Sequence, residues 1–573
     1  MKKILLFLTV FILNTTWGQF LSLDWFDNIN SANLYPQKTI TNNDGEVYNI
    51  GAFIGDTNFD PSGNSGQTYH NQGQPIFIQK LDAQGNYVWD RIFTSVGSTG
   101  KATDIKIRYE NGQEYVYVLG YFIGTIDFDP GSDVFQLSAN DYHDIFLLKL
   151  DSAGNFIWAR QFGNPNVVDV AYNFAFDSQN NIYLTGFFNF PPYLYDYILD
   201  ALVTWGGIYS TDMEIIKLDT NGNILWNKVL SGNGYIGSNT ISVNQQDEVI
   251  IAGDFQGTID FDPGNAVQEL TTPNNISHNN SFILKLDQNG NFIWVKQLVS
   301  SVDAEIYFLK LDQNDNLYLV GGFSNNIDFD PGPNQYVSDV GHGNGRAFLL
   351  KLSSNGEFVW VDQFLFGLSS ISFFNNDRIF GIAKCHDYRE YSTLSGNYQL
   401  TGSPNNPNVE DILVEINPHN GELTQHFNFP KYNNEGIYPY SINFYNSSMF
   451  MLGIYLGTDI DFDPGPGELL QSTGFQTQNG FIIKYDISTS NVVENQKDYP
   501  LKLYPNPTTD AVFYIKGITG KYDISITDVA GKIIKKQKNV TNQTPINIPG
   551  AKGVYFVRIE TVNGILTKKL IVK

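Results

Sequence analysis

A hairpin sequence that returns at a nearly constant interval constrains the fold of this chain more than any other feature. Its copies read KLDAQGNYVW, KLDSAGNFIW, KLDTNGNILW, KLDQNGNFIW and KLSSNGEFVW within a chain of 573 residues. The tryptophans that end these copies are Trp89, Trp158, Trp226, Trp294 and Trp360. A sequence that recurs at a nearly fixed interval is typical of proteins built from repeated supersecondary units that stack on their neighbours.

Each hairpin follows another pair of apolar runs, and the second run of that pair contains a glycine. These glycines are Gly51, Gly120, Gly186, Gly253, Gly321, Gly381 and Gly453. Alternating apolar residues between Gly, Asn and Asp turns predict four short strands per unit, and a glycine inside a strand indicates a bulge or a close backbone approach. Seven such units predict an all-β, seven-bladed β-propeller, with a linear β-solenoid as the alternative.

The two ends of the repeat region predict a closed ring. The last unit runs through GFIIKYD (480–486), and no aromatic residue follows at the position of the hairpin tryptophan. The segment FLSLDWFDNI near the N-terminus places Trp25 close to one repeat length before Trp89. We therefore expect the N-terminal strand to complete the last blade.

Residues 1–18 are expected to be a signal peptide that is removed before Gln19. Lys2 and Lys3 precede an apolar run at 4–13, which is too short to span a bilayer as a stable helix. No other run is long and apolar enough for a transmembrane segment, so none is expected in the mature chain. The single cysteine, Cys385, excludes an intramolecular disulfide framework.

Charge separates the rest of the chain into two parts. The formal net charge is −24, yet residues 499–573 hold 12 Lys and Arg against 4 Asp and Glu. We expect an acidic propeller at 19–490, a polar linker at 491–500 and a small basic domain at 501–573. An acidic surface repels phosphate, so nucleic acid is not an expected partner.

The repeats resemble the SBBP-type β-propeller repeats of secreted bacterial proteins. The shared features are KLDxxGNxxW and strands such as YLTGFF, and the resemblance covers roughly residues 20–490. It implies the propeller fold but no particular activity, because propellers host many functions.

The C-terminal segment resembles the type A sorting domain of the type IX secretion system. About seven short alternating strands between Pro and Gly turns independently predict a small Ig-like β-sandwich. The resemblance implies a Gram-negative host, Sec export, the type IX machinery as partner, and a protein that is released or held at the outer-membrane surface. The matching residues are Tyr504, Pro505, Asn506, Pro507, Asp528, Gly531, Lys532, Gly553 and Tyr555.

A second repeated motif, DFDPG, follows the glycine strand in four units and leaves two interpretations open. Asp-Pro-Gly forms a turn without any ligand, and this interpretation is favoured because one motif recurs around the ring. Paired aspartates with backbone carbonyls also suit calcium, the one cofactor that the sequence suggests. Catalysis by these carboxylates is not expected. The aspartates are Asp127, Asp129, Asp260, Asp262, Asp328, Asp330, Asp461 and Asp463.

No motif of a known catalytic site appears, so the protein is not expected to be an enzyme and no catalytic residue is assigned. We expect a non-catalytic binding or adhesion module for an extracellular glycan or protein. An aromatic insert at 189–212, with Trp205, is the first candidate for a ligand patch. The alternatives are a polysaccharide-acting hydrolase, which needs unique acidic residues near the ring axis, and a purely structural surface protein.

Overall fold

The computed structural model describes residues 21–487 and 502–572 apart from short gaps. Gaps of four or more residues lie at 63–66, 191–194, 197–200, 203–211, 274–277, 340–344, 386–389, 393–398, 402–409, 464–467, 474–477 and 517–521. The chain divides into two compact units, Met1–Ser488 and Thr489–Lys573. Every regular element longer than a turn in the described residues is a β-strand, so the all-β prediction is confirmed. The expected signal peptide and linker lie outside the described residues.

The larger unit is built mainly from antiparallel arrays of four strands that follow one another in chain order. Strand β1 joins the first and the last of these arrays into one sheet of nine strands, and the unit also contains smaller sheets of two and three strands. The first strands are β1 (Leu21–Thr41), β6 (Thr99–Glu110), β12 (Val168–Phe176), β19 (Ile236–Val243), β25 (Ala304–Leu311), β31 (Gly367–Phe374) and β38 (Glu435–Tyr445). The second strands are β2 (Val47–Asn58), β7 (Gln113–Ile123), β13 (Ile182–Phe190), β20 (Val249–Phe255), β26 (Leu317–Ser324), β32 (Arg378–Cys385) and β39 (Ser448–Leu456).

The two outer strands of each array form the repeated hairpin. The third strands are β4 (Ile76–Leu81), β10 (Asp144–Asp151), β16 (Asp212–Leu218), β23 (Asn280–Leu286), β29 (Gly345–Leu352), β35 (Glu410–Ile416) and β42 (Gln478–Ile487). The fourth strands are β5 (Tyr87–Phe93), β11 (Phe156–Phe162), β17 (Ile224–Leu230), β24 (Phe292–Leu298), β30 (Phe358–Phe364) and β36 (Leu423–Asn428).

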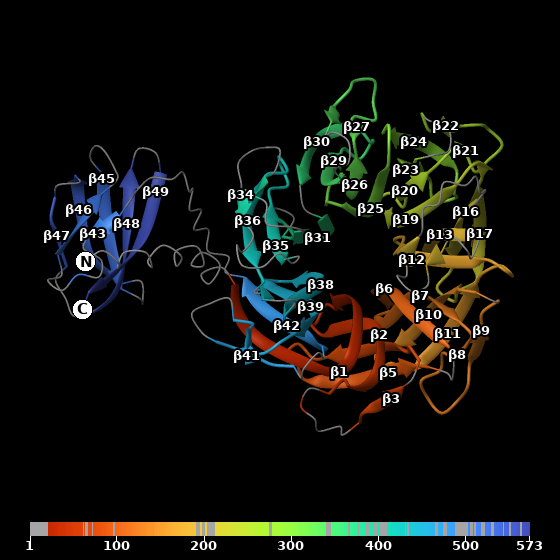
Figure 1. Cartoon of the computed structure of the whole chain (residues 1–573), viewed down its shortest axis with the longest axis horizontal. Helices are drawn as coiled ribbons and strands as arrows, with labels where there is room; N and C mark the ends of the chain where they lie inside the picture. The colour runs from red at the N-terminus through yellow and green to blue at the C-terminus, as the bar shows by residue number, and fades with distance from the viewer. Residues whose placement is uncertain are drawn as a thin grey trace, which may run out of the picture. The chain divides into compact units, whose positions relative to one another are not determined.

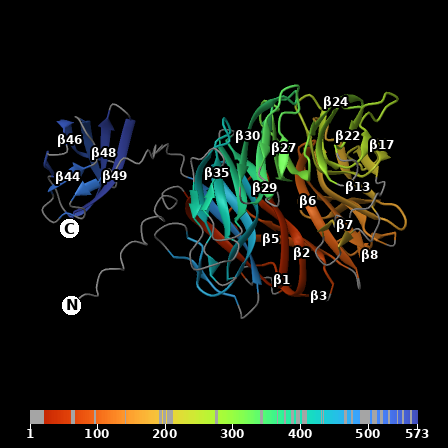
Figure 2. The ribbon, with the colours of Figure 1, turned by 45° about the horizontal axis from the view of Figure 1, so that its top comes forward.

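The first strands lie toward the centre of this unit and contact one another in a closed cycle. Each contacts the next one along the chain, and β38 contacts β1. In Figures 1 and 2 the sheets accordingly follow one another around a ring, and Figure 1 shows β12 and β25 nearer its centre than β17 and β30. The propeller architecture is confirmed. The count of seven blades stays a prediction, because parts of the ring lie outside the described residues.

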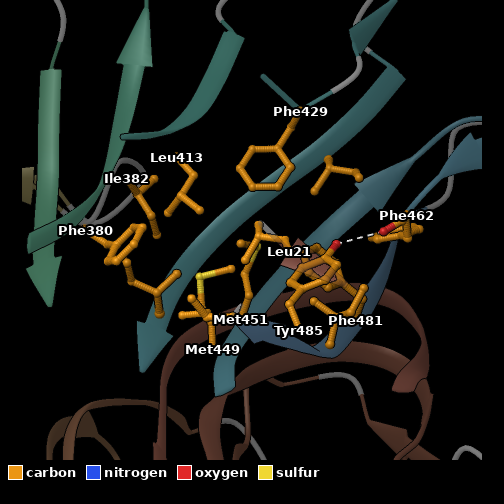
Figure 3. Packing of buried hydrophobic residues seen from close by; sticks show 14 of the residues in the cluster. Leu21, Phe380, Ile382, Leu413, Phe429, Met449, Met451, Phe462, Phe481 and Tyr485 are labelled. Carbon is orange, nitrogen blue, oxygen red and sulfur yellow. Dashed lines mark hydrogen bonds between the residues drawn. The ribbon is translucent and has the colours of Figure 1, made fainter. Parts of the chain in front are cut away.

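Strand β1 is 21 residues long and belongs to two of these arrays, the first and the last. Its first part pairs with β42, with Trp25 opposite Lys484, and its second part pairs with β2. Leu21 packs in one buried cluster with Phe481 and Tyr485 of β42, where the Tyr485 hydroxyl donates to the Phe462 carbonyl at 2.8 Å (Figure 3). The N-terminal strand therefore supplies the fourth strand of the β38–β39–β42 sheet.

In six of the four-stranded arrays the predicted glycine of the second strand lies against a bulge in the first strand. The prediction of a bulge is wrong for Gly381, which pairs with Ile371, because the bulge of β31 lies opposite Ile382 and Ala383. The register between β19 and β20 shifts between Ser238 and Thr240, and Gly253 pairs with Ser238. A Cβ at Gly253 would lie 2.0 Å from the Gly237 carbonyl oxygen, a distance that no real Cβ tolerates. Here the expected bulge and the expected close approach occur together.

The hairpin tryptophans join each blade to the next. Trp89 Nε1 donates to the carbonyl of Ser152 at 3.2 Å, and the Trp89 ring lies against Gly154 in that same turn. Gly154 has a φ of 77°, a conformation that favours glycine. The same hydrogen bond, from an indole Nε1 to a backbone carbonyl, joins Trp25 to Ala83, Trp158 to Thr220, Trp226 to Gln288 and Trp360 to Pro418.

The C-terminal unit is a small sandwich of two sheets. One sheet contains β43 (Lys502–Tyr504), β44 (Val512–Lys516) and β47 (Ile546–Asn547). The other contains β46 (Ile533–Val540), β45 (Tyr522–Asp528), β48 (Gly553–Thr561) and β49 (Gly564–Val572). Apolar residues from both sheets, including Phe513 and Val557, share one buried core, as the alternating sequence predicts.

Candidate functional site

The aspartates of the DFDPG loops accept hydrogen bonds from the backbone of their own loops. Asp127 Oδ1 accepts from the amides of Asp129 at 3.1 Å and Phe135 at 2.8 Å, and Asp129 Oδ1 accepts from Gly131 at 2.8 Å. Asp260 with Asp262, and Asp328 with Asp330, make the same bonds, and Asp461 accepts from Asp463 and Leu469. These contacts are those of a capped turn.

The phenylalanine between the two aspartates anchors each loop. Phe128 is fully buried and packs against Phe122 and Phe146 of its own sheet, with ring centroids 5.5 and 4.9 Å away. Phe261, Phe329 and Phe462 are buried in the same way. The loop motif thus combines an apolar anchor with backbone caps.

The structure gathers no group of three or more His, Cys, Asp or Glu side chains suited to a metal in the residues it describes. Two histidines each lie beside one aspartate: His70 Nδ1 is 2.7 Å from Asp56 Oδ1, and His278 Nδ1 is 3.5 Å from Asp303 Oδ1. Calcium in the DFDPG loops stays a prediction.

Parts of two predicted sites lie outside the described residues. These are Trp205, with most of the aromatic insert, and Pro505, Asn506, Pro507 and Gly531 of the sorting motif. Tyr504 and Asp528 lie in strands β43 and β45, Lys532 is exposed, Gly553 begins β48, and Tyr555 is buried in the core of the sandwich.

A pocket of about 360 Å³ beside β25 brings together polar side chains that sequence reasoning missed. Asp303, Glu305 and Tyr307 line it from the start of β25, and Arg346 lines it from β29. Gly322 of β26 leaves room beside the Tyr307 hydroxyl. First strands begin where second strands end, so this pocket lies on the side of the ring from which the DFDPG loops project.

Two carboxyl groups from neighbouring sheets interact beside this pocket. Asp254, at the end of β20, is 4% exposed, and Glu305 is half-buried. Burial, followed by the charge of Glu305, raises the pKa of Asp254 well above its ordinary value, and burial also raises the pKa of Glu305. Two close carboxyl groups resist being ionised together, so the charge on either one favours the protonated form of the other.

Hydrogen bonds hold both carboxyl groups in place. Asn239 Nδ2 donates to Asp254 Oδ1 at 3.1 Å, and the Tyr235 hydroxyl also bonds to this carboxyl group. Asn279 Nδ2 donates to Glu305 Oε1 at 2.9 Å, and the Tyr307 hydroxyl bonds to Glu305. Neighbouring blades therefore form one polar network, which presents Glu305 and the half-exposed Tyr307 to the pocket.

Arg346 contributes a hydrogen-bond donor, its Nε, to this region. Its Nε is buried and finds no hydrogen-bond partner within the described part of the chain. Burial also lowers the pKa of the Arg346 guanidinium. A buried donor without a partner costs about 1–3 kcal/mol, which an acceptor on a bound ligand would recover.

One sequence signal for this network exists in the repeats themselves. Asp254 follows Gly253, at the position where the other glycine strands carry an apolar residue or glycine, such as Tyr121, Phe187 or Gly322. A carboxylate at this position departs from the repeat pattern, and the residue in the same register of β32 is Lys384. The contact of Asp254 with Glu305, which belongs to the next blade, is visible only in the folded chain.

Models of known families match one segment in each part of the chain. Residues 502–573 match the secretion system C-terminal sorting domain, and residues 157–186 match a β-propeller repeat. Both resemblances are confirmed: the protein is a β-propeller exported by type IX secretion and is secreted or held at the cell surface. Within the described residues, no helix has the length and apolar character needed to cross a membrane.

Individual relatives are distant. The uncharacterized WD repeat-containing protein L264 of Acanthamoeba polyphaga mimivirus is 24% identical over 337 residues, which is 50% of this chain and 24% of that protein. The chain thus spans about a quarter of this relative's length.

Solved structures with similarity include PorZ, an essential bacterial surface component of the type-IX secretion system of Porphyromonas gingivalis. It shows 11% identity, covers 94% of this chain and 81% of its own, and has a TM-score of 0.19. The dihydro-heme d1 dehydrogenase NirN shows 9% identity, coverages of 89% and 76%, and a TM-score of 0.31. The Plexin A4 extracellular region shows 7% identity, covers 95% of this chain and 67% of its own, and has a TM-score of 0.33. These scores support no conclusion on function.

Proposed function

We propose that this surface β-propeller is a non-catalytic binding module whose pocket beside β25 holds an extracellular glycan. The convergence of Glu305, Tyr307 and Arg346 in one pocket carries the proposal. Sugar hydroxyls both donate and accept hydrogen bonds, so they can pair with a carboxylate, a phenol and the unsatisfied Arg346 Nε. The half-exposed Tyr307 ring offers an apolar face to the C–H side of a sugar.

The remaining parts of the proposal concern export and architecture. They comprise a cleaved N-terminal signal in a Gram-negative host, a closed ring of seven blades, and surface display or release after the sorting domain has acted. The sorting-domain match and the cyclic contacts of the first strands support these parts. A protein ligand remains the alternative partner, and calcium in the DFDPG loops is a separate proposal with its own test.

A polysaccharide hydrolase is the second candidate, favoured by one observation. Asp254 and Glu305 interact closely and have raised pKa values, and a protonated carboxyl group beside an ionised one is the pattern of an acid–base pair. However, Asp254 is almost fully buried, and Glu305 rather than Asp254 lines the pocket. We therefore favour binding over hydrolysis.

Glycan-array binding of the mature protein, with and without calcium, tests the proposal. Glu305→Gln preserves size but removes the charge, and we expect at least about tenfold weaker binding, as for the loss of a charge-assisted hydrogen bond. Glu357→Gln, an exposed change in the hairpin of the same blade, should bind as the parent does. Equal binding by Glu305→Gln would contradict the site, and release of reducing ends from a bound polysaccharide would establish the hydrolase.

A further inference from the structure

Three lysines of the first strands, two from neighbouring blades and one from a blade further round the ring, lie at the inner face of the ring. Lys38 lies in β1, Lys106 in β6 and Lys310 in β25. The side chains of Lys38 and Lys106 keep 31% and 28% of their exposure, so solvent reaches them although the first strands surround them. The charges of Lys38 and Lys106 both act on Lys310.

A single carboxylate, Asp104, balances part of this charge. Its side chain is 1% exposed and forms ion pairs with Lys38 Nζ and, at 3.3 Å, with Lys106 Nζ. The Asp104 carboxylate also accepts hydrogen bonds from the amides of Ile105 at 3.0 Å and Phe174 at 3.5 Å. Burial opposes its ionisation, but the charges of Lys106 and Lys38 hold the pKa of Asp104 below its ordinary value. Asp104 is therefore ionised and fully engaged.

Lys310 has no such partner. Its Nζ donates to Ser372 Oγ at 3.3 Å, and no carboxylate pairs with it in the described part of the ring. Its ammonium group also lies 5.8 Å from the centre of the Phe308 ring. Burial, followed by the charges of Lys38 and Lys106, lowers the pKa of Lys310 to about 7, and burial lowers the pKa of Lys106 to about 8. The charge of Asp104 acts in the opposite direction on Lys310. Within the described residues, the cluster thus holds more positive than negative charge.

We propose that Lys38, Lys106 and Lys310 bind an oxyanion of the phosphate or sulfate class at the inner face of the ring. Three ammonium groups against one carboxylate leave two positive charges in excess, which a doubly charged anion matches. The ammonium groups supply donors from three different strands, whereas the oxyanion supplies acceptors in several directions. The site is separate from the Glu305 pocket, and its test does not depend on glycan binding there.

Isothermal titration of the mature protein with sodium phosphate and sodium sulfate, at matched ionic strength in sodium chloride, tests this site. We expect saturable binding of both anions. Sulfate keeps its double negative charge between pH 6 and pH 8.5, so its binding should become weaker over this interval because Lys310 loses its proton. Lys310→Gln should bind at least about tenfold more weakly and lose most of the pH dependence. Lys384→Gln, an exposed change on β32, should bind as the parent does.

A melting curve for Lys310→Gln shows whether a loss of binding reflects a loss of folded protein. We expect this variant to be at least as stable as the parent, because it buries less unpaired charge. Absence of phosphate and sulfate binding by the parent, or parent-like binding by Lys310→Gln, would overturn the proposal. Glucose 6-phosphate and a sulfated disaccharide distinguish the source of the anion. Tighter binding of an ester assigns the site to a modified saccharide, and tighter binding of the free ion assigns it to the inorganic anion.

Discussion

Trp25 Nε1 donates a hydrogen bond of 3.3 Å to the backbone carbonyl of Ala83, and this bond joins the last sheet of the ring to the first. A Cβ at Gly85, in the same turn as Ala83, would lie only 2.7 Å from the Trp25 ring. Trp89 makes the same pair of contacts with Ser152 and Gly154 between blades that the chain connects directly. The contact between the two ends of the ring therefore uses the same chemistry as the contacts inside it.

Trp25→Ala should destabilise the propeller by about 2–3 kcal/mol, because a half-buried indole and its hydrogen bond are lost. Trp25→Phe keeps most of the packing and should cost about 1 kcal/mol. Urea unfolding measures both, with Val267→Ala, 71% exposed, as the neutral control. Deletion of residues 20–30 should lower the stability of the whole ring, and parent-like melting of this deletion would disprove the closure.

Asp27→Asn should make the stability of the protein less dependent on pH. Burial, followed by the charges of Asp82 and Asp60, raises the pKa of Asp27 to about 7, whereas an unfolded aspartate titrates near pH 4. The folded state therefore binds an extra proton between these values, and stability falls as pH rises through this window. We expect Asp27→Asn to be more stable than the parent by up to about 4 kcal/mol at pH 8, at about 1.4 kcal/mol for each pKa unit, with little difference near pH 4. The same difference in urea unfolding at both pH values would contradict this.

Substitutions at Asp260 separate the turn from the calcium interpretation. Asp260 Oδ1 accepts from two amides, of Asp262 and Gln268, so Asp260→Ala should cost about 1–2 kcal/mol. Asp260→Asn keeps an acceptor oxygen and should melt close to the parent if the loop is only a turn. If the loop binds calcium, calcium should raise the melting temperature of the parent, a chelator should lower it, and Asp260→Asn should respond less.

Removal of the sorting domain should block export across the outer membrane. A chain that ends at residue 500 retains the propeller but lacks the segment 502–573 that matches the sorting domain. We expect this chain to accumulate in the periplasm, as measured by fractionation and by protease accessibility on whole cells. Surface exposure of the truncated chain at the level of the full chain would show that export does not need this domain.

The repeat pattern alone predicted the elements that depend on local chemistry. Alternating apolar residues predicted the strands, and glycines such as Gly253 predicted the places where a first strand comes too close for a side chain. The DFDPG sequence predicted a turn because an aspartate can cap amides within its own loop, as Asp127 does. These interactions join residues near each other in the chain, or repeat at a fixed period, and so appear directly in the sequence.

Only the tertiary structure brought together the residues of the two proposed sites. Asp254 and Glu305 belong to different sheets, and Lys38, Lys106 and Lys310 come from three blades. Their raised or lowered pKa values arise from burial and from charges that are distant in sequence, which no local pattern encodes. The sequence by itself determined a repeated β-sheet ring with an export domain. The tertiary structure decided which charged side chains outside the repeat pattern lie close to one another. This could not be predicted from the sequence, because only the folded ring places the first strands around one axis.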